Sequence, residues 1–449
     1  MNTVSIIRLG CPKNMVDAEV MEALLFEKGF RVVDPSERAD VVIVNTCTFI
    51  DAAKEEAIDE IFGAIARKNR GECTYVIMAG CMAQRYGAAL EKELPEVDLF
   101  VGVGEVPRIA AHVSCLIEHG RGTVRSIIGA PDFLMDASCP RVVSTPTSSA
   151  FIKIAEGCSN YCSYCIIPTV RGAYRSRTPD DIIREAEGLG GQGIRELILT
   201  AQETTWYGHD LPGRPTLSLV MRELASLDCI KWVRLLYTHP LHLTDDLFKT
   251  MAEEDKICNY IDMPVQHIDD DILKAMNRRG GSDHIRSCIA GARAWMPEIT
   301  LRTSLIVGFP GETVPQFTRL REFVKEARFD HLGVFTYSKE EGTAAAEMPC
   351  QVAARTKESR KRVIMETQAP ISFEKNQALI GSIQEVLVQE PSDIPEYDYI
   401  GRTQSQAPEI DGITYVNAPH AAVGTIITCR IDAADTYDLY GTIIAVKRS

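Results

Sequence analysis

The chain has 449 residues, of which 45% are hydrophobic and 24% are charged, as is ordinary for a soluble globular protein. At about 150 residues per domain, this length predicts roughly three domains. Lys and Arg number 48 against 62 Asp and Glu, which gives a formal net charge of −14. This balance argues against DNA or RNA binding through general electrostatics, although a local basic patch stays compatible with it, and it suits a basic partner.

Membrane and export signals are not evident in the sequence. No apolar run approaches the about 18 residues that cross a bilayer, and the N-terminal residues do not have the pattern of a signal peptide. We therefore expect a cytoplasmic protein with no membrane partner. Its 14 cysteines are then expected to be metal ligands, catalytic groups or buried small side chains rather than disulfides.

The first 130 residues alternate short β-branched runs with helical patterns. A helix is expected at residues 16–28, closed by Gly29, and strands are expected at residues 4–9, 41–44, 75–79 and 99–103. This alternation is typical of a parallel sheet with helices on both faces. No dinucleotide-binding fingerprint follows the first strand, so a nucleotide-binding Rossmann domain is not predicted.

A second α/β region follows a stretch rich in Pro, Ser and Thr, residues 131–150, which we interpret as a linker. Six βα units indicate a partial or full barrel with its site at the C-terminal ends of the strands, and a long charged helix is expected after them at residues 355–376. The expected strands are residues 151–155, 196–200, 232–237, 260–263, 301–307 and 332–337. The expected helices include residues 180–188, 217–226, 269–276 and 314–327.

Residues 380–449 change to short strands broken by Gly and Pro, at 382–388, 413–416, 424–430 and 439–447, which fits a small antiparallel barrel. The predicted fold class is therefore a multidomain α/β protein. Its parts are an N-terminal parallel α/β domain (1–130), the linker (131–150), a central (βα) barrel domain (151–379) and a C-terminal antiparallel β-barrel (380–449).

Cys158, Cys162 and Cys165 form a C-x3-C-x2-C motif directly after the strand expected at 151–155. Three thiolates this close in a strand-to-helix loop can bind three corners of a [4Fe–4S] cluster and leave the fourth iron open to a small molecule. Gly157 gives the loop room. A zinc site would need a fourth ligand, which the loop does not contain, so zinc and buried structural cysteines are the weaker alternatives.

A second group of cysteines follows three strands of the N-terminal region. Cys11 lies two residues after the first expected strand, Cys47 three after the second and Cys81 two after the third. Strand ends on one edge of a parallel sheet converge, so these three thiols are candidates for a second three-ligand cluster site. The alternative is three coincidental core cysteines, because free cysteine is often buried.

The C-x3-C-x2-C loop, with residues 153–157 (KIAEG) before it and 166–168 (IIP) after it, resembles the radical S-adenosylmethionine (SAM) enzymes. More narrowly, the chain resembles the methylthiotransferases, which also carry three N-terminal cysteines and a C-terminal TRAM barrel. The resemblance covers essentially the whole chain. It implies a transferase with two [4Fe–4S] clusters and SAM as cofactors, fed by an electron donor such as flavodoxin or ferredoxin.

Within that family, several stretches are similar to the branch that modifies an aspartate of the small-subunit ribosomal protein S-twelve, rather than isopentenylated adenosine in transfer RNA. The stretches are residues 9–14 (LGCPKN) with Val16, Asp17 and Glu19, 45–50 (NTCTFI) with Ala53, Glu55 and Glu56, 261–267 (IDMPVQH), 276–280 (MNRRG) and 407–412 (APEIDG). The resemblance implies methylthio transfer to the β-carbon of that aspartate. Methylthiolation of transfer RNA stays the alternative.

The resemblance also implies roles for particular residues. Cys158, Cys162 and Cys165 would hold the cluster that binds SAM, and Cys11, Cys47 and Cys81 an auxiliary cluster that holds the transferred sulfur. Residues 305–312 (LIVGFPGE) resemble the segment that faces the adenine and ribose of SAM. The candidate cofactor contacts are Tyr164, Arg171, Gln202, Gly308 and Glu312. His267 follows another strand and is given no role, because a lone histidine is more often structural.

The charge of the last domain bears on the substrate. Residues 380–449 hold ten Asp and Glu against four Lys and Arg, a net charge of −6, whereas an RNA-binding barrel is expected to present cations to phosphate. An acidic barrel favours a basic ribosomal protein, although it can also serve solubility alone. A non-catalytic metal-binding scaffold that docks on the ribosome is the rival from another class, and it predicts no cleavage of SAM.

Overall fold

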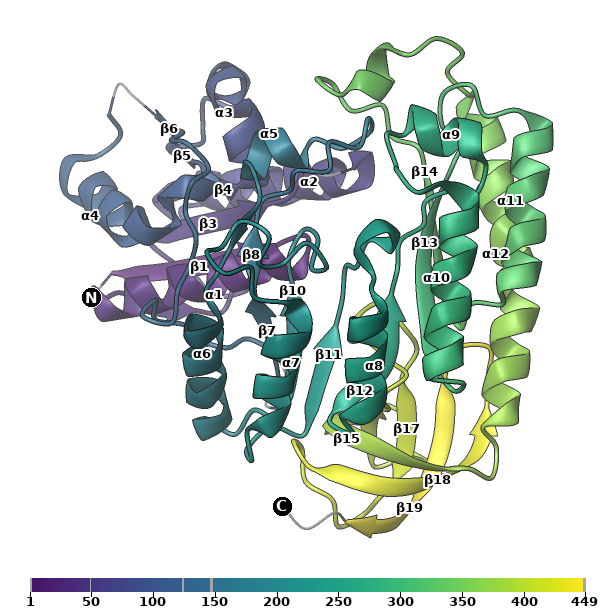
Figure 1. Cartoon of the computed structure of the whole chain (residues 1–449). Helices are drawn as coiled ribbons and strands as arrows, with labels where there is room; N and C mark the ends of the chain where they lie inside the picture. Colours follow the sequence, from purple (N-terminus) through teal and green to yellow (C-terminus); the bar gives the residue numbers. More distant parts are fainter. Residues whose placement is uncertain (1, 49, 123–124, 146–147, 447–449) are drawn as a thin grey trace.

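The structure is a computed structural model that describes residues 2–48, 50–122, 125–145 and 148–446. Phe49 of the second cysteine-bearing stretch, residues 146–147 of the expected linker and residues 447–449 of the expected last domain lie outside the described residues. Three sheets dominate the fold: a six-stranded sheet, a second six-stranded sheet and a closed barrel (Figure 1). None of the helices in these described segments is long and apolar enough to cross a membrane.

The N-terminal sheet is parallel throughout and has the strand order β2-β1-β3-β4-β5-β6. Every residue of β3 is buried, as expected for a strand covered by helices on both faces. The strands are β1 (Thr3–Arg8), β2 (Arg31–Val33), β3 (Val41–Thr46), β4 (Tyr75–Gly80), β5 (Leu99–Val101) and β6 (Ser126–Ile127). The helices are α1 (Pro12–Glu27), α2 (Asp51–Asn69), α3 (Cys81–Glu93) and α4 (Ile109–His119).

The central sheet is also parallel, in the order β14-β13-β12-β11-β10-β7, and it does not close on itself. It is therefore the partial form of the expected barrel. Its strands are β7 (Ser149–Lys153), β10 (Glu196–Thr200), β11 (Trp232–Leu235), β12 (Ile257–Asp262), β13 (Thr300–Val307) and β14 (His331–Thr336). A two-stranded ribbon, β8 (Ala155–Glu156) and β9 (Arg175–Ser176), pairs next to the cysteine loop.

Most helices of this domain pack on the outside of the curved sheet (Figure 1). Except for the short helix at residues 167–171, which packs against α3, their apolar faces join the strands in one large core, because leucine and isoleucine recur at helical spacing. They are α5 (Ile167–Arg171), α6 (Pro179–Gly191), α7 (Leu217–Ser226), α8 (Asp245–Glu253), α9 (Asp270–Ala275), α10 (Gly281–Trp295), α11 (Val314–Ala327) and α12 (Ala354–Ala378). Three short 3-10 helices complete the described helical segments: η1 (Val103–Arg108), η2 (Pro240–His242) and η3 (Ala344–Glu347).

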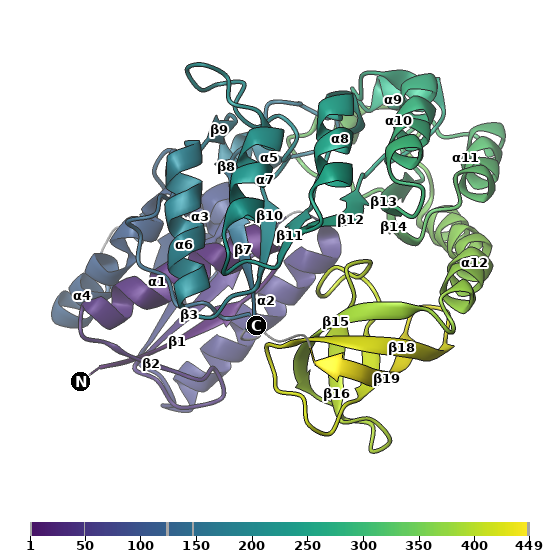
Figure 2. The same ribbon diagram turned by 60° about the horizontal axis from the view of Figure 1, so that its bottom comes forward.

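The C-terminal barrel closes in the order β15-β16-β17-β19-β18. It differs from the expected antiparallel barrel at one pair, because β17 and β19 run parallel. The strands are β15 (Ile383–Pro391), β16 (Tyr399–Arg402), β17 (Thr414–Asn417), β18 (Ile426–Ala434) and β19 (Leu439–Val446). The long helix α12 leads from the partial barrel down to this barrel, which lies beneath the central strands (Figure 2).

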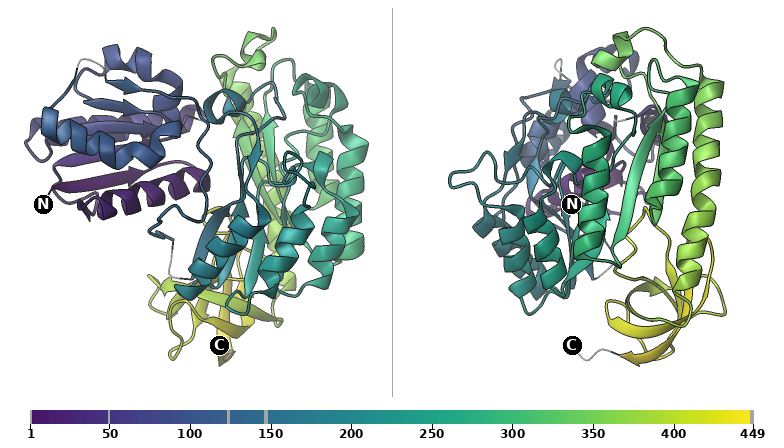
Figure 3. Two further views of the ribbon diagram at one scale, coloured as in Figure 1. Left: turned by 60° about the vertical axis from the view of Figure 1, so that its left-hand side comes forward. Right: turned by 45° about the vertical axis from the view of Figure 1, so that its right-hand side comes forward.

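The N-terminal sheet lies to one side of the central domain (Figure 3). Cross-domain ion pairs hold it there: Arg85 of α3 and Lys54 of α2 both bind Glu340, at 2.7 and 3.0 Å. Arg141, within the expected linker, binds Glu19 of α1 at 2.6 Å and Glu185 of α6 at 2.8 Å. The expected domain boundaries at 130, 150 and 379 stay predictions.

Candidate functional site

The N-terminal cysteines follow three strands that are immediate neighbours in the sheet, β1, β3 and β4. Cys11 precedes the first residue of α1, Cys47 follows β3 directly, and Cys81 is the first residue of α3. Cys47 and Cys81 are 7% exposed. Because parallel strands end at one edge, the three thiols lie together there, and two of them are at helix N-termini, whose partial positive charge favours a thiolate.

Glycines let the loops around these cysteines approach one another. Gly10 has a φ of +87°, and a Cβ atom there would lie 2.6 Å from Cβ and 2.9 Å from Sγ of Cys47. Gly80 has a φ of +90°, and its Cβ would lie 2.5 Å from the side-chain oxygen of Asn45. Both positions therefore require glycine, for conformation and for space.

The C-x3-C-x2-C loop lies between β8 and α5. The amide of Cys158 donates to the carbonyl of Gly172 at 3.1 Å, and the amide of Cys165 donates to the carbonyl of Cys162 at 3.0 Å. Gly157 adopts a φ of +79°, and a Cβ there would lie 2.2 Å from the carbonyl oxygen of Ala173. The loop is thus held in a compact turn by backbone contacts, partly within itself and partly with residues 172–173 after α5.

A buried ionic network joins the two cysteine groups across the domain boundary. Asp17 of α1 binds Lys153 at 2.7 Å and Arg171 at 2.6 Å, and Glu156 contacts the same two cations. Each of these four side chains is at most 4% exposed. The guanidinium of Arg171 also donates to Sγ of Cys81, from Nε at 3.3 Å and from an Nη at 3.2 Å.

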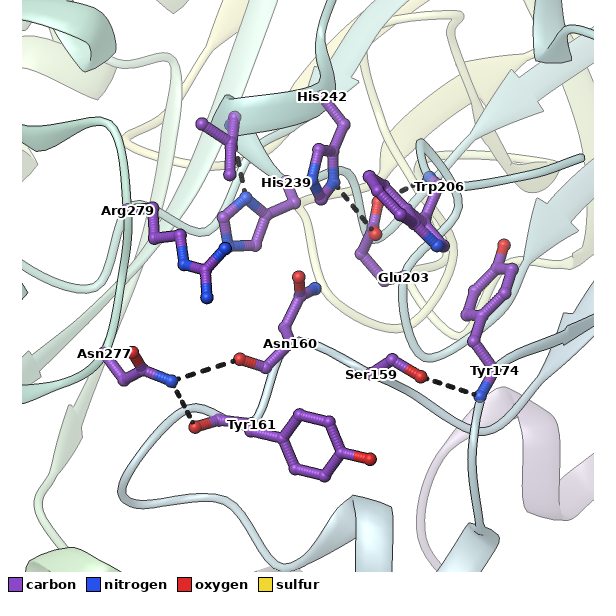
Figure 4. A pocket seen from close by; sticks show the side chains of 11 residues that line it. Ser159, Asn160, Tyr161, Tyr174, Glu203, Trp206, His239, His242, Asn277 and Arg279 are labelled. Atoms are coloured by element: carbon purple, nitrogen blue, oxygen red, sulfur yellow. Dashed lines mark hydrogen bonds and ion pairs between the residues drawn. The ribbon is translucent and has the colours of Figure 1, made fainter. Parts of the chain in front are cut away.

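A cavity of about 440 Å³ lies on the other side of the cysteine loop. In Figure 4 the imidazole of His242 points to Glu203, and the Trp206 indole lies beside them. His242 Nδ1 is 3.1 Å from Glu203, and the Trp206 and His242 ring centroids are 4.4 Å apart. The cavity is lined by Ser159, Asn160, Tyr161, Tyr174, Glu203, Trp206, His239, Leu241, His242, Asn277 and Arg279.

Comparisons with known proteins place all three sheets in described families. Residues 3–102 match the family described as Uncharacterized protein family UPF0004, residues 152–324 match the Radical SAM superfamily, and residues 380–444 match the TRAM domain. A ribosomal protein uS12 methylthiotransferase RimO of Syntrophus aciditrophicus is 56% identical over 99% of this chain and 98% of its own. RimO proteins of Geobacter sulfurreducens and Trichlorobacter lovleyi are 49% and 48% identical, each over 98% of both chains.

The chain belongs to the RimO family of radical SAM methylthiotransferases. It is a transferase, and the cofactors of this family are SAM and [4Fe–4S] clusters. The predicted membership of the methylthiotransferases is confirmed. The alternative substrate, transfer RNA, is not favoured.

Two solved structures share the fold at low sequence identity. A radical SAM methyltransferase, TsrM of Kitasatospora setae, aligns over 74% of this chain and 73% of its own with a TM-score of 0.52 and 16% identity. The cobalamin-dependent radical enzyme OxsB aligns over 82% of this chain and 56% of its own, with a TM-score of 0.50 and 10% identity. At these identities the likeness concerns the fold alone.

The two cysteine groups of this methylthiotransferase fit clusters better than single ions. In the described part of the chain, no three His, Cys, Asp or Glu side chains are grouped so that they could hold one metal ion. A [4Fe–4S] cluster binds each of its cysteines through a different iron, so its thiolates do not need to share an ion. Gly10 leaves room for the side chain of Cys47, and the N–H groups of Arg171 donate to Sγ of Cys81. Both features suit thiolates that bind a cluster.

The pKa values of four of these cysteine thiols are shifted, and not all in the same direction. Burial raises the pKa of Cys81 to about 12 and that of Cys158 to about 11, and it also raises the pKa of Cys165. Burial acts in the same sense on Cys11, but Lys13 and Arg171 outweigh it and lower the pKa of that thiol. Binding of iron by Cys81, Cys158 and Cys165 must therefore displace protons.

The structure distributes the predicted cofactor contacts over three places. Tyr164, within the cysteine loop, packs among apolar side chains, and its hydroxyl is 3.5 Å from Arg278, whose guanidinium is 3.9 Å from Cys162 Sγ. Gln202 donates to Glu156, and its own buried carbonyl oxygen has no partner among the described residues. Arg171 lies against Cys81, as described above. These assignments stay predictions.

Gly308 and Glu312 lie against α12. The amide of Gly308 donates to the Glu312 carboxylate, which also binds Arg360 of α12 at 3.0 Å. A Cβ at Gly308 would lie 2.4 Å from the Lys357 side chain. None of the five predicted cofactor contacts lines the cavity.

Sequence reasoning missed Lys153, Arg278 and the three-residue group Glu203, Trp206 and His242. Lys153 and Arg278 belong to stretches that were quoted for the resemblance, but nothing in their spacing indicates a contact with the cysteine groups. Glu203 could have been predicted from its position, because it lies three residues after the end of β10, at the C-terminal end of a strand of the partial barrel.

Proposed function

We propose that this chain replaces a β-carbon hydrogen of an aspartate in ribosomal protein uS12 with a methylthio group. The single observation that carries the proposal is the placement of two three-cysteine groups on either side of one domain boundary. Arg171 lies six residues after Cys165 and contacts Cys81 of the other group. Sulfur insertion at an unactivated carbon needs both a source of radical chemistry and a sulfur carrier close to it, and two adjacent cluster sites meet this need.

Cys158, Cys162 and Cys165 would hold the radical cluster, and Cys11, Cys47 and Cys81 the auxiliary one. When bound, the clusters and SAM supply a low-potential electron, hydrogen-abstracting radical chemistry, the sulfur and its methyl group. The chain's own side chains bind and shield. Lys153, Asp17 and Arg171 fix the two halves of the site to each other and bury the boundary between them.

The cavity beside the loop and the carbonyl oxygen of Gln202 support a SAM site on the central-domain side. The cavity volume of about 440 Å³ is in the range of small-molecule sites. Tyr164, Arg171, Gln202, Gly308 and Glu312, none of which lines this cavity, are proposed to bind or position the cofactor. Of these, Gln202 offers a buried hydrogen-bond acceptor without a partner among the described residues, and Gly308 and Glu312 would act through the turn that follows β13.

Recognition of uS12 is proposed to involve the C-terminal barrel. Tyr397, Tyr415 and Tyr440 form a half-buried aromatic cluster with ring centroids 5.4 to 5.7 Å apart. Burial raises the pKa of Tyr415, and the carboxylates of Asp393 and Asp438 add to this effect, which places acidic groups beside the rings. Carboxylates next to aromatic faces suit the Lys and Arg of a basic ribosomal protein.

Flavodoxin or ferredoxin is the class of electron donor proposed, and the cytoplasm, where ribosomes are built, is the proposed location. Both follow from the reaction, which needs a low-potential electron and a ribosomal protein.

The proposal is tested in a bacterium that lacks its own uS12 methylthiotransferase. The chain is expressed as wild type or as Cys162→Ala, and uS12 is purified from the ribosomes for peptide mass spectrometry. We expect one methylthio group in place of hydrogen on a single aspartate with the wild type and an unmodified protein with Cys162→Ala. Unmodified uS12 in both strains, with the wild-type chain folded and loaded with iron, would contradict the proposal.

A further inference from the structure

Arg171 belongs by sequence to the radical SAM domain but by contact to the N-terminal cysteine group. It is the last residue of the short helix α5, and its side chain is 4% exposed. Two of its N–H groups point at Sγ of Cys81, and one of its Nη atoms also donates to the Asn14 side chain at 3.1 Å. Asn14 in turn donates to the carbonyl of Leu9 at 2.7 Å, next to the end of β1.

The charges around Arg171 are buried and paired, and Lys13 adds a third buried cation nearby. Lys153 and Arg171 face Asp17 and Glu156, so two cations meet two carboxylates. A buried ion pair is tolerable only when its members are paired and hydrogen-bonded, and removal of one member leaves an uncompensated charge. Loss of Arg171 would make the charge beside Cys81 one unit more negative, whereas loss of Asp17 would make it one unit more positive.

We propose that Arg171 is a positioning residue of the auxiliary site, which sets the reduction potential of a cluster held by Cys11, Cys47 and Cys81 from across the domain boundary. This inference rests on the cluster assignment made under the proposed function. Reduction adds negative charge to a cluster, and N–H donors and positive charge at a ligand sulfur stabilise that charge. Arg171 therefore raises the potential, and its partner Asp17 lowers it.

The test measures the auxiliary cluster alone. The parent is the full chain with Cys158, Cys162 and Cys165 all replaced by Ala, reconstituted anaerobically with iron and sulfide. Its midpoint potential is read from a redox titration followed by electron paramagnetic resonance. We expect Arg171→Gln to shift the midpoint to more negative values and Asp17→Asn to shift it to more positive values.

Arg171→Lys and Arg85→Gln separate electrostatics from docking. Arg171→Lys keeps the charge but not the paired N–H groups, so its midpoint is expected between those of the parent and of Arg171→Gln. It also serves as the second variant if Arg171→Gln loads poorly. Arg85, 5% exposed on α3, joins the same two domains through Glu340, and Arg85→Gln is expected to leave the midpoint unchanged.

The results overturn the inference in distinguishable ways. Arg171→Gln and Asp17→Asn variants that bind iron normally but share the midpoint of the parent would overturn the tuning role alone. If the midpoint potential shifted in the same direction in Arg171→Gln, Asp17→Asn and Arg85→Gln, Arg171 would only hold the two domains together. A parent without iron would instead overturn the auxiliary-site assignment, and with it the proposed function.

Discussion

Glu196 on β10 and Arg402 on β16 form an ion pair across the boundary between the partial barrel and the C-terminal barrel. Arg234 of β11 binds the other carboxylate oxygen at 2.7 Å, and all three side chains are at most 2% exposed. The guanidinium of Arg234 also donates to the carbonyl of Gln404 at 2.7 Å. The chain after β16 therefore covers the interior polar groups of the central strands.

Removal of the charge of Glu196 should weaken the whole fold. Glu196→Gln leaves two buried guanidinium groups without a counter-charge, which should lower the free energy of unfolding by about 3 kcal/mol at pH 7. Glu253→Gln is the matched control, because Glu253 is 47% exposed in its pair with Arg222, and it should cost less than about 0.5 kcal/mol. Urea denaturation measures both. Equal effects of the two variants would contradict the role of Glu196.

The effect of Glu196 should depend on pH. Burial acts to raise its pKa, but Arg402 and Arg234 outweigh burial and lower the pKa to about 2. Because the folded-state pKa lies below the unfolded value of about 4.3, the contribution is complete above that value and is lost as the pH falls toward 2. The gap in unfolding free energy between wild type and Glu196→Gln should stay constant from pH 8 to 6 and narrow below pH 4. A gap of unchanged size at pH 3 would be inconsistent with this pairing.

Gly10 should be necessary for the N-terminal cluster site but not for the other one. In Gly10→Ala the new methyl group would overlap Cys47, so the iron content should fall from about eight to about four per chain. Gly29→Ala provides the control, because Gly29 has a similar φ of +91° but nothing within 4 Å of the added Cβ. Iron analysis after anaerobic reconstitution compares the two. Full iron content in Gly10→Ala would mean that the approach of Gly10 to Cys47 is unimportant.

The two cysteine groups should separate two partial activities. Cys162→Ala removes a ligand of the radical cluster, so reductive cleavage of SAM should be abolished. Cys47→Ala should retain part of that cleavage but lose methylthio transfer. Chromatography for the cleavage product and mass spectrometry of the substrate peptide follow the two activities separately. Equal loss of both in a folded Cys47→Ala variant would argue against distinct roles.

Strand positions could be predicted from the sequence because the parallel strands are continuous apolar runs, and β10 is observed at the predicted residues. The convergence of Cys11, Cys47 and Cys81 followed from the same pattern, since each cysteine closely follows a strand. The contact of Arg171 with Cys81 could not be predicted, because the two are 90 positions apart and meet only when the domains dock. Short strands such as β2 and β16 were missed, as they have few apolar residues to mark them.

Charge on the C-terminal barrel should control the affinity for uS12. The double substitution Asp393→Lys and Glu396→Lys, at two exposed positions near the tyrosine cluster, should weaken binding, most strongly at low salt, where charges are least screened. Glu187→Lys with Glu298→Lys makes the same charge change at exposed positions of the central domain and should leave binding near the wild-type level. Titration at two salt concentrations measures this. A similar loss in both double variants would point to net charge rather than to the barrel.

The central claim concerns the substrate, and one anaerobic competition reaction tests it most directly. Reconstituted enzyme, reductant and SAM are mixed with a uS12 peptide and isopentenylated transfer RNA together, and both are analysed by mass spectrometry. We predict a methylthio group on the peptide aspartate and none on the adenosine. A methylthio group on the adenosine with an unmodified peptide would contradict the assignment.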